Sequence, residues 1–251
     1  MTPPLDRKIA FITGGNRGIG FETARQLGAL GILPVIGARS AEAGRDAVAR
    51  LREEGIEAES IVFDVTDDAD HRRAFDFFEK KAGRLDILVN NAGVYLEGEP
   101  GGESRYRPST VPDKVLRATF DANLFAPIAV TQALLPLLRL SPAGRIVNLS
   151  SVLGSLTLHS DPSSDIYAAK VLGYNASKTA LNAFTVHLAH ELKDETTKVN
   201  SAHPGWVQTE MGGSAAPMAV GDGAKTSVLL ATLPADGPSG GFFHLGDTLP
   251  W

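Results

Sequence analysis

Residues 13–20 read Thr13-Gly-Gly-Asn-Arg-Gly-Ile-Gly20, and this stretch decides the fold. It follows an apolar β-rich run, Lys8–Thr13, and leads directly into a segment of helical period, Ile19–Leu30. Glycine permits a tight turn and lets backbone N–H groups approach a pyrophosphate, which the positive end of a helix dipole favours. In this strand-to-helix context the turn predicts a dinucleotide site, and the alternative is a Gly-rich turn that binds no ligand.

Short apolar runs alternate with helical segments along the rest of the chain, the pattern of a parallel sheet covered on both faces. The expected strands are Lys8–Thr13, Leu33–Ala38, Ala58–Phe63, Ile87–Asn90, Arg145–Leu149, Val199–His203 and Gly241–Leu245. The expected helices include Ile19–Leu30, Ala41–Glu54, Asp67–Ala82, Asp113–Leu138 and Tyr174–Lys193. Right-handed crossovers favour one α/β domain over residues 1–251, with a doubly wound parallel sheet of Rossmann type. Ligands of such sheets bind at the carboxyl ends of the strands.

Composition excludes several classes of function. The 251 residues are 43% hydrophobic and 21% charged, which is ordinary for a globular protein. Their formal charge of −5 provides no basic field for nucleic acid or anionic lipid. The absence of cysteine excludes disulfides, thiolate metal sites and cysteine nucleophiles. We therefore expect a cytoplasmic protein without nucleic-acid or membrane partners, because the amino terminus lacks a signal-peptide pattern and prolines interrupt the most apolar segment, Phe125–Leu138.

Cofactor preference is read at the ends of the second and third strands. An acidic residue after the second strand binds the ribose 2′-hydroxyl of NAD, whereas a basic residue accommodates the 2′-phosphate of NADP. This chain has Arg39 there, and Arg17 can add a second guanidinium, so NADPH is favoured over NADH. The alternative is that Arg39 is a solvated loop residue. Asp64 can either bind the adenine amino group or cap the helix that follows Thr66.

Tyr174 and Lys178 are four residues apart at the start of the last long predicted helix, so their side chains project from the same face. A free phenol ionises near pH 10, and the Lys178 cation would favour the phenolate. Tuned in this way, Tyr174 can protonate a carbonyl oxygen as hydride reaches the carbon, or remove the alcohol proton in the reverse reaction. Taken alone, a Tyr and a Lys at this interval are also common on exposed helix surfaces.

Two serines end the strand Arg145–Leu149. Ser151 is the preferred hydrogen-bond donor to a developing oxyanion, and Ser150 is the competing candidate. The Gly-x-Ser-x-Gly pattern of a nucleophile elbow surrounds neither serine, which argues against a serine hydrolase. His187 and His190 share a helix without a convincing third ligand, so we expect them on a solvated face and expect no metal site.

In this order, these pieces resemble the short-chain dehydrogenase/reductase family over nearly the whole chain. The matching pieces are residues 13–20, Asn90-Asn-Ala-Gly93, Asn123, Ser151, Tyr174 with Lys178, and Pro204-Gly205 followed by Thr209. The stretches 144–148 and 199–205 are similar to those of the carbonyl reductase type that uses NADPH, which agrees with the interpretation of Arg39.

The resemblance implies a catalytic tetrad of Asn123, Ser151, Tyr174 and Lys178. In it, Lys178 also holds the nicotinamide ribose, and Asn123 positions a water in a proton relay, although Asn123 can also satisfy nearby backbone. The complete set of expected cofactor contacts is Gly14, Asn16, Arg17, Gly18, Ile19, Gly20, Arg39, Asp64, Val65, Asn90, Ala92, Gly93, Tyr174, Lys178, Pro204, Gly205, Val207 and Thr209.

Three loop expansions, near residues 97–111, 156–173 and 206–218, are expected to border the substrate pocket. The second places Ser151 and Tyr174 23 positions apart, farther than is usual in the family. It contains Tyr167, which we reject as the acid because its fourth following residue is Val171 rather than a lysine. Insertions at this point in similar carbonyl reductases obstruct tetramer assembly, so both a monomer and a homo-oligomer remain open. Candidate pocket residues are Val94, Tyr95, Leu153, His159, Trp206 and Met211, each of which can instead be simple packing.

The sequence therefore predicts an oxidoreductase that transfers a hydride from NADPH to the carbonyl carbon of a small or medium apolar ketone or aldehyde, with reversible alcohol oxidation. Two alternatives remain: a non-catalytic NADP(H)-binding sensor, which has no need of the combined tyrosine, lysine and serine, and an NAD-dependent alcohol dehydrogenase, against which Arg39 argues.

Overall fold

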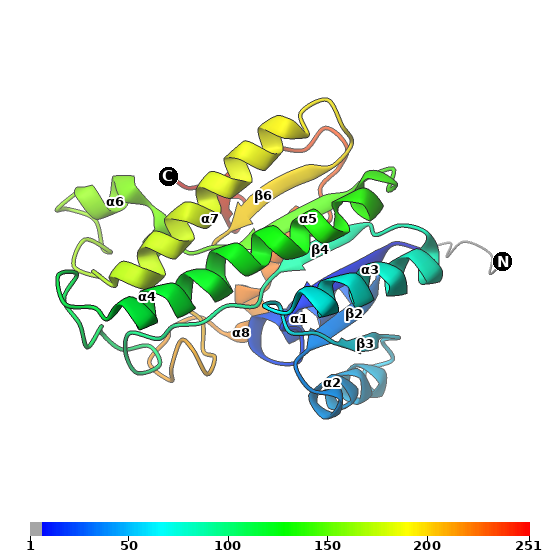
Figure 1. Cartoon of the computed structure of the whole chain (residues 1–251), viewed down its shortest axis with the longest axis horizontal. Helices are drawn as coiled ribbons and strands as arrows, with labels where there is room; N and C mark the ends of the chain where they lie inside the picture. Colours follow the sequence, from blue (N-terminus) through cyan, green and yellow to red (C-terminus); the bar gives the residue numbers. More distant parts are fainter. Residues whose placement is uncertain (1–6) are drawn as a thin grey trace.

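The computed structural model describes residues 7–251, which form one eight-stranded sheet between two layers of helices (Figure 1). The strands are β1 Ile9–Thr13, β2 Leu33–Ala38, β3 Glu59–Val62, β4 Ile87–Asn90, β5 Arg145–Leu149, β6 Lys198–Ala202, β7 Phe242–His244 and β8 Asp247–Thr248. Their order is β3-β2-β1-β4-β5-β6-β7-β8, and neighbouring strands are parallel except β7 with β8. The predicted doubly wound Rossmann-type sheet is confirmed, and its strand order reverses between β1 and β4, where such folds bind their ligands.

Helices cover both faces of this sheet. They are α1 Gly18–Ala29, α2 Ala41–Glu53, α3 Asp68–Ala82, α4 Asp113–Phe120, α5 Ala126–Arg139, α6 Leu156–Ser160, α7 Leu172–Glu191, α8 Val220–Gly223 and α9 Lys225–Ala231. A π-helical turn, Asp121–Phe125, joins α4 to α5, and a 3-10 turn, Val152–Gly154, follows β5. One core cluster unites the sheet with α3, α5 and α7, and a second unites it with α1, α2 and α9.

Strand β1 shows why the two layers form. Successive side chains of a strand point to opposite faces, and here Ile9 and Phe11 enter the core under α3, α5 and α7, whereas Ala10 and Ile12 enter the other. All five residues of the strand are buried. A continuous apolar run is what a parallel strand covered on both faces requires.

The predicted helices match the structure to within one or two residues at each end, and two differences bear on the site. The expected helix 113–138 is one continuous helical run, but it contains the π turn 121–125. In such a turn the backbone hydrogen bonds join residues five apart instead of the four of an α-helix. Helix α7 begins at Leu172, two residues before the expected start. Tyr174 is therefore the third residue of the helix rather than its first.

The helical run Asp113–Arg139 is long and apolar enough to cross a membrane by length and composition alone. Half of its most apolar 18-residue window is buried inside the protein. It packs on α3 and α7, and Leu134 and Leu138 of α5 belong to the core under that layer. Its hydropathy is therefore accounted for by a core helix, and Pro136 within it does not interrupt the helix.

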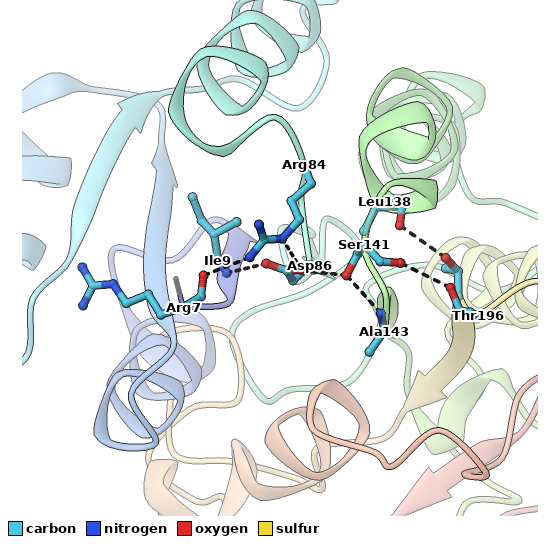
Figure 2. A network of polar contacts seen from close by, with 9 residues as sticks. Arg7, Ile9, Arg84, Asp86, Leu138, Ser141, Ala143 and Thr196 are labelled. Carbon is cyan, nitrogen blue, oxygen red and sulfur yellow. Dashed lines mark hydrogen bonds and ion pairs between the residues drawn. The ribbon is translucent and has the colours of Figure 1, made fainter. Parts of the chain in front are cut away.

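Asp86 connects three segments at the amino-terminal ends of the central strands β1 and β4 (Figure 2). Its Oδ2 accepts the backbone N–H of Ile9 at 2.9 Å. Its Oδ1 accepts Arg84 Nε at 3.0 Å and the Ser141 hydroxyl at 2.6 Å. Asp86 is 1% exposed, so these three bonds replace water at a buried carboxylate and fix the starts of β1 and β4 against the loop after α5.

Asp86→Asn is expected to lower the free energy of unfolding by about 2 kcal/mol, because an amide nitrogen must face donors where the carboxylate accepted them. Urea denaturation monitored by circular dichroism measures this. The matched control is Asp113→Asn, since the Asp113–Arg117 pair is exposed and its loss should cost less than about 0.5 kcal/mol. Equal effects of the two substitutions would contradict the role given to Asp86.

Candidate active site

The glycine turn between β1 and α1 is shaped for a close backbone approach. Gly14 and Gly18 have φ of 62° and 55°, a region that side-chain-bearing residues rarely adopt. A Cβ at Gly20 would lie 2.7 Å from the backbone carbonyl oxygen of Gly14, so only glycine fits there. Arg17, the residue before α1, makes no side-chain cap, which leaves the first N–H groups of the helix free of such a partner. These features fit the pyrophosphate of a dinucleotide.

Asn91 and Thr13 hold this turn to the neighbouring strand. Asn91 Nδ2 donates to the carbonyl oxygens of Thr13 and Gly14 at 2.8 and 3.1 Å. The Thr13 hydroxyl accepts the N–H groups of Asn91 and Ala92, both at 3.0 Å. The expected cofactor residues Gly14 and Ala92 are therefore brought to the same place, and Asn91 is a positioning residue that the predicted cofactor set omitted.

Asn90 supports the site from inside the sheet rather than facing it. Its Nδ2 donates to Thr131 Oγ1 and Asn148 Oδ1 at 2.9 and 2.8 Å, and the residue is 3% exposed. Asn148 continues this buried polar chain to Thr185 on α7. The side chain of Asn90 thus ties the carboxyl ends of β4 and β5 to the helices above them.

The two arginines expected at the adenosine end of the cofactor lie in different surroundings. Arg39 is exposed at the end of β2, and its charge lowers the pKa of nearby Asp64 after the larger effect of two hydrogen bonds from Thr66. Arg17 instead forms an ion pair with Glu210, which joins the glycine turn to the loop after β6. The prediction that Arg17 adds a second guanidinium for the 2′-phosphate is therefore not supported by this pairing.

Asp64 and Val65 form the turn after β3. Asp64 Oδ1 accepts the N–H and the hydroxyl of Thr66 at 2.9 and 2.7 Å. The alternative that Asp64 caps the next helix is wrong, because the cap of α3 is Asp67, whose carboxylate accepts the N–H of Ala69. The Val65 carbonyl lies 2.8 Å from His71 Nε2, which fixes this turn to α3.

The segment after β6 approaches the glycine turn from the other side. Gly205 has a φ of 91°, and Pro204 and Val207 are buried. A Cβ built on Gly18 would lie 3.4 Å from the Thr209 side chain, so Gly18 and Thr209 are neighbours across the cleft. Asn16 lies in the glycine turn and is partly buried, and Ile19, at the start of α1, packs against the core. A pocket of about 490 Å³ opens beside Gln208, Thr209 and Glu210.

The expected catalytic residues come together around Gly93. A Cβ at Gly93 would lie 3.1 Å from Asn123 Oδ1 and 3.7 Å from Lys178 Nζ. Lys178 Nζ is 5.7 Å from the centre of the Tyr174 ring, and it donates to the carbonyl oxygen of Leu149 at 2.7 Å. Helix α7 therefore places Tyr174 and Lys178 over the carboxyl ends of β4 and β5.

Ser151 rather than Ser150 contacts Tyr174. The Ser151 side chain lies close enough to the phenol to lower the pKa of Tyr174 against the larger effect of burial, whereas the Ser150 hydroxyl donates to the backbone carbonyl of Lys178 at 3.5 Å. The Ser151 oxygen also accepts the N–H of Leu153 at 3.2 Å, as the cap of the 3-10 turn. His203 fixes the same turn, because its Nδ1 accepts the N–H of Val152 at 3.1 Å.

Asn123 is held entirely by neighbouring groups. Its Oδ1 accepts the Val94 N–H at 2.8 Å, and its Nδ2 donates to the Val94 carbonyl at 2.9 Å and to Ser177 Oγ at 3.1 Å. The residue is fully buried in the π turn. The sequence left two roles open for Asn123: positioning a water, or hydrogen bonding to nearby backbone. These contacts correspond to the second role.

The acid–base pair is tuned by burial. Burial raises the pKa of Tyr174 to about 12, although the nearby Ser151 side chain acts in the opposite direction. Burial also lowers the pKa of Lys178 to about 8. The expectation that Lys178 would lower the pKa of Tyr174 is therefore not met: burial raises this pKa, and the side chain that opposes burial is Ser151 rather than Lys178. A phenol with this pKa is protonated at pH 7 and is ready to act as an acid.

The expansion 156–173 folds over the start of α7. His159 belongs to its internal contacts rather than to a pocket wall: its Nε2 lies 3.0 Å from the Leu153 carbonyl, and Lys170 Nζ donates to the His159 carbonyl at 2.7 Å. Tyr167, rejected as the acid, is 42% exposed, and its ring contacts Lys170.

Aromatic and sulfur side chains lie just before the expansion 97–111, at Tyr95, and within the expansion 206–218, at Trp206 and Met211. Tyr95 packs edge-on against Tyr174, with ring centres 5.7 Å apart. Trp206 and Met211 are 50% and 40% exposed. His187 and His190 are exposed on α7, as expected. Within residues 7–251, no three His, Asp or Glu side chains are grouped so that they could hold a metal ion.

Residues 8–219 match the short chain dehydrogenase family model, so the chain belongs to this family of oxidoreductases. It is 31% identical to (+)-neomenthol dehydrogenase from Capsicum annuum, over 94% of this chain and 95% of that protein. It is 30% identical to carbonyl reductase [NADPH] 1 from Mus musculus, over 98% and 99%. The solved structure of salutaridine reductase from Papaver somniferum superimposes with a TM-score of 0.82 at 31% identity, covering 94% of this chain and 99% of that one.

Proposed function

We propose that this protein is an NADPH-dependent reductase of small or medium apolar ketones and aldehydes, which can also oxidise the corresponding alcohols. One observation carries the proposal: the phenol of Tyr174 lies close to the side chains of Ser151 and Lys178, at the carboxyl ends of strands next to a turn shaped for a dinucleotide. A sensor that only binds the cofactor needs none of these three side chains in contact.

The cofactor would be held along the edge where β1, β4, β5 and β6 end. Its pyrophosphate fits the glycine turn, and the exposed guanidinium of Arg39 suits a 2′-phosphate. Residues 91–93 and 204–209 would border the nicotinamide end, and Lys178 would hold its ribose. The relative named carbonyl reductase [NADPH] 1 supports the same preference.

When bound, NADPH supplies the hydride that reaches the carbonyl carbon. The residues of this chain manage the oxygen and the proton: Ser151 donates a hydrogen bond to the carbonyl oxygen, and Tyr174 transfers its phenolic proton to that oxygen as negative charge develops. Lys178 holds positive charge close to the phenolate that remains. Because the pKa of Tyr174 lies well above neutral pH, the phenol carries the proton that the reduction consumes.

Arg39→Asp is expected to weaken NADPH binding about 30-fold, because a bidentate contact to a phosphate is lost and a repulsive charge is introduced. NADH binding should stay within about 3-fold. The measurement is a titration of each reduced cofactor by fluorescence, followed by oxidation assays over aldehydes, ketones, diketones and quinones. The matched control is Arg45→Asp, which changes an exposed arginine of α2.

Turnover of apolar carbonyls with NADPH, lost at low NADPH concentration in Arg39→Asp but not in Arg45→Asp, supports the proposal. A wild-type preference for NADH with alcohol oxidation would favour the dehydrogenase alternative. Tight NADPH binding with no turnover across the panel would overturn the reductase and return the sensor to consideration.

A further inference from the structure

We propose that Glu97 is a positioning residue for proton transfer, because its buried carboxylate holds the first turn of α7 and thereby aims the phenol of Tyr174. This inference rests on the proposed catalytic function of Tyr174. It concerns a residue that reaches the site from the loop after β4, far from α7 in the sequence.

The carboxylate supplies a helix cap from a distant segment. Glu97 Oε2 accepts the backbone N–H of Tyr174 at 2.8 Å, across 77 positions of sequence. The first N–H groups of any helix lack partners within the helix, and Val171, the residue before α7, makes no side-chain cap. Glu97 therefore takes the place that a local Ser, Asp or Asn would fill, and its negative charge suits the positive end of the helix dipole.

The carboxylate of Glu97 is buried, and a glycine on α7 leaves room for it. Glu97 is only 1% exposed, and an isolated carboxylate is costly to bury unless it is hydrogen-bonded. A Cβ at Gly173 would lie 2.9 Å from Glu97 Oε2, so the absence of a side chain at 173 is what lets the carboxylate approach the helix. Gly173 itself is buried.

The same segment is anchored at its other end by a catalytic candidate. Asn123 binds both the N–H and the carbonyl of Val94, and the next residue, Tyr95, packs its ring against that of Tyr174. The backbone carbonyl of Glu97 accepts the Arg105 N–H at 2.7 Å, which closes the loop behind it. Residues 94–97 thus form a short brace between Asn123 and Tyr174, and the Glu97 carboxylate is its contact with the α7 backbone.

This brace fixes the position of the Tyr174 backbone, and with it the position of the phenol. Without the bond from Glu97, the first turn of α7 loses a partner for the N–H of the very residue whose side chain must meet the substrate oxygen. Displacing a catalytic group by about 1 Å can cost about 100-fold in rate. The glycine turn and Arg39, which would bind the phosphates of the cofactor, lie on elements other than α7, so the loss should appear mainly in kcat rather than in cofactor affinity.

Three substitutions separate reach from charge. Glu97→Ala removes the acceptor, and Glu97→Asp keeps the charge but shortens the side chain by one methylene; both are expected to lower kcat about 30-fold, with KM and NADPH affinity changed less than about 3-fold. Glu97→Gln keeps an acceptor oxygen at the same reach and is expected to retain at least about a third of kcat. The control is Glu99→Ala, because Glu99 is an exposed carboxylate of the same loop, paired with Arg105.

Amide hydrogen exchange of the peptide spanning 172–178 gives a readout that needs no turnover. Exchange there should accelerate about 10-fold or more in Glu97→Ala and Glu97→Asp, but not in Glu97→Gln or Glu99→Ala. If Glu97→Ala does not fold, the comparison of Asp with Gln decides. Wild-type kcat in Glu97→Asp, or unchanged exchange in that variant, would overturn the proposal. A wild-type protein that reduces no carbonyl would remove the proposed function, while exchange would still decide whether Glu97 holds this turn.

Discussion

Tyr174→Phe is expected to lower kcat about 10³-fold while the NADPH dissociation constant changes less than about 3-fold. The phenol is the acid that protonates the substrate oxygen, and general acid catalysis contributes about 10² to 10⁴ in rate. Phenylalanine keeps the ring that packs edge-on against Tyr95, so the helix and the pocket should keep their shape. Steady-state assays with NADPH and the best carbonyl of the panel measure kcat, and fluorescence titration measures cofactor affinity.

The control for this substitution is Tyr167→Phe. Tyr167 lies in the expansion 156–173, where it is 42% exposed and carries a lysine over its ring. The substitution should leave kcat within about 2-fold of the wild type, because phenylalanine keeps the ring against Lys170 and removes only a hydroxyl from an exposed residue. Near-normal turnover in Tyr174→Phe, or a large loss in Tyr167→Phe, would show that the wrong tyrosine has been assigned.

Lys178→Met is expected to lower kcat about 10²-fold or more and, at pH 7, to make the protein more stable. Burial lowers the pKa of Lys178 from its ordinary value of 10.5 to about 8, which corresponds to about 3 kcal/mol spent on keeping the ammonium charged inside the fold. Methionine has a similar shape and no charge, but it leaves the Leu149 carbonyl without its donor, at a cost of about 1 kcal/mol. The expected net gain in unfolding free energy is about 1 to 2 kcal/mol.

The pH dependence of this gain has a definite sign. Below pH 8 the lysine is charged in both the folded and unfolded states, so the wild type bears the full cost of burying the charge. Between about pH 8 and 10.5 the unfolded chain binds more protons at this group than the folded one, and wild-type stability rises with pH. The advantage of Lys178→Met should therefore be largest at pH 7 and shrink by pH 9.5.

Urea denaturation at pH 7.0 and 9.5 measures this difference, with Lys193→Met as the control. Lys193 lies just beyond α7 and is 59% exposed, so its replacement should change neither stability nor its pH dependence by more than about 0.5 kcal/mol. A Lys178→Met protein that is less stable than the wild type at pH 7 would mean that the buried ammonium stabilises the fold. Unchanged kcat would remove Lys178 from the catalytic group.

The fold was predictable because its signals are local. Strand β1, the glycine turn and α1 follow one another within about twenty residues, and each is specified by its own composition. The same is true of Tyr174 and Lys178, which share one helix face whatever surrounds them. The family model confirms the oxidoreductase class, and the separate catalytic and cofactor roles remain proposals.

The parts that could not be predicted depend on contacts between distant segments. Glu97 is one of many carboxylates in the sequence, and nothing within several residues of it indicates that it caps α7. The pairing of Arg17 with Glu210 likewise joins segments 193 positions apart, so a guanidinium that seemed available for phosphate has a carboxylate partner. The raised pKa of Tyr174 results from burial, which the spacing of Tyr174 and Lys178 does not encode.

The π turn that carries Asn123 makes this part of the chain sensitive to length rather than to composition. A point substitution within residues 121–125 leaves the number of residues in the turn unchanged. Loss of one codon in that interval would let the run from α4 to α5 wind as regular α-helix, in which each residue advances the helix by about 100°. Asn123 would then turn away from Val94. In evolutionary terms, this segment should tolerate exchange of side chains far better than single-residue deletion.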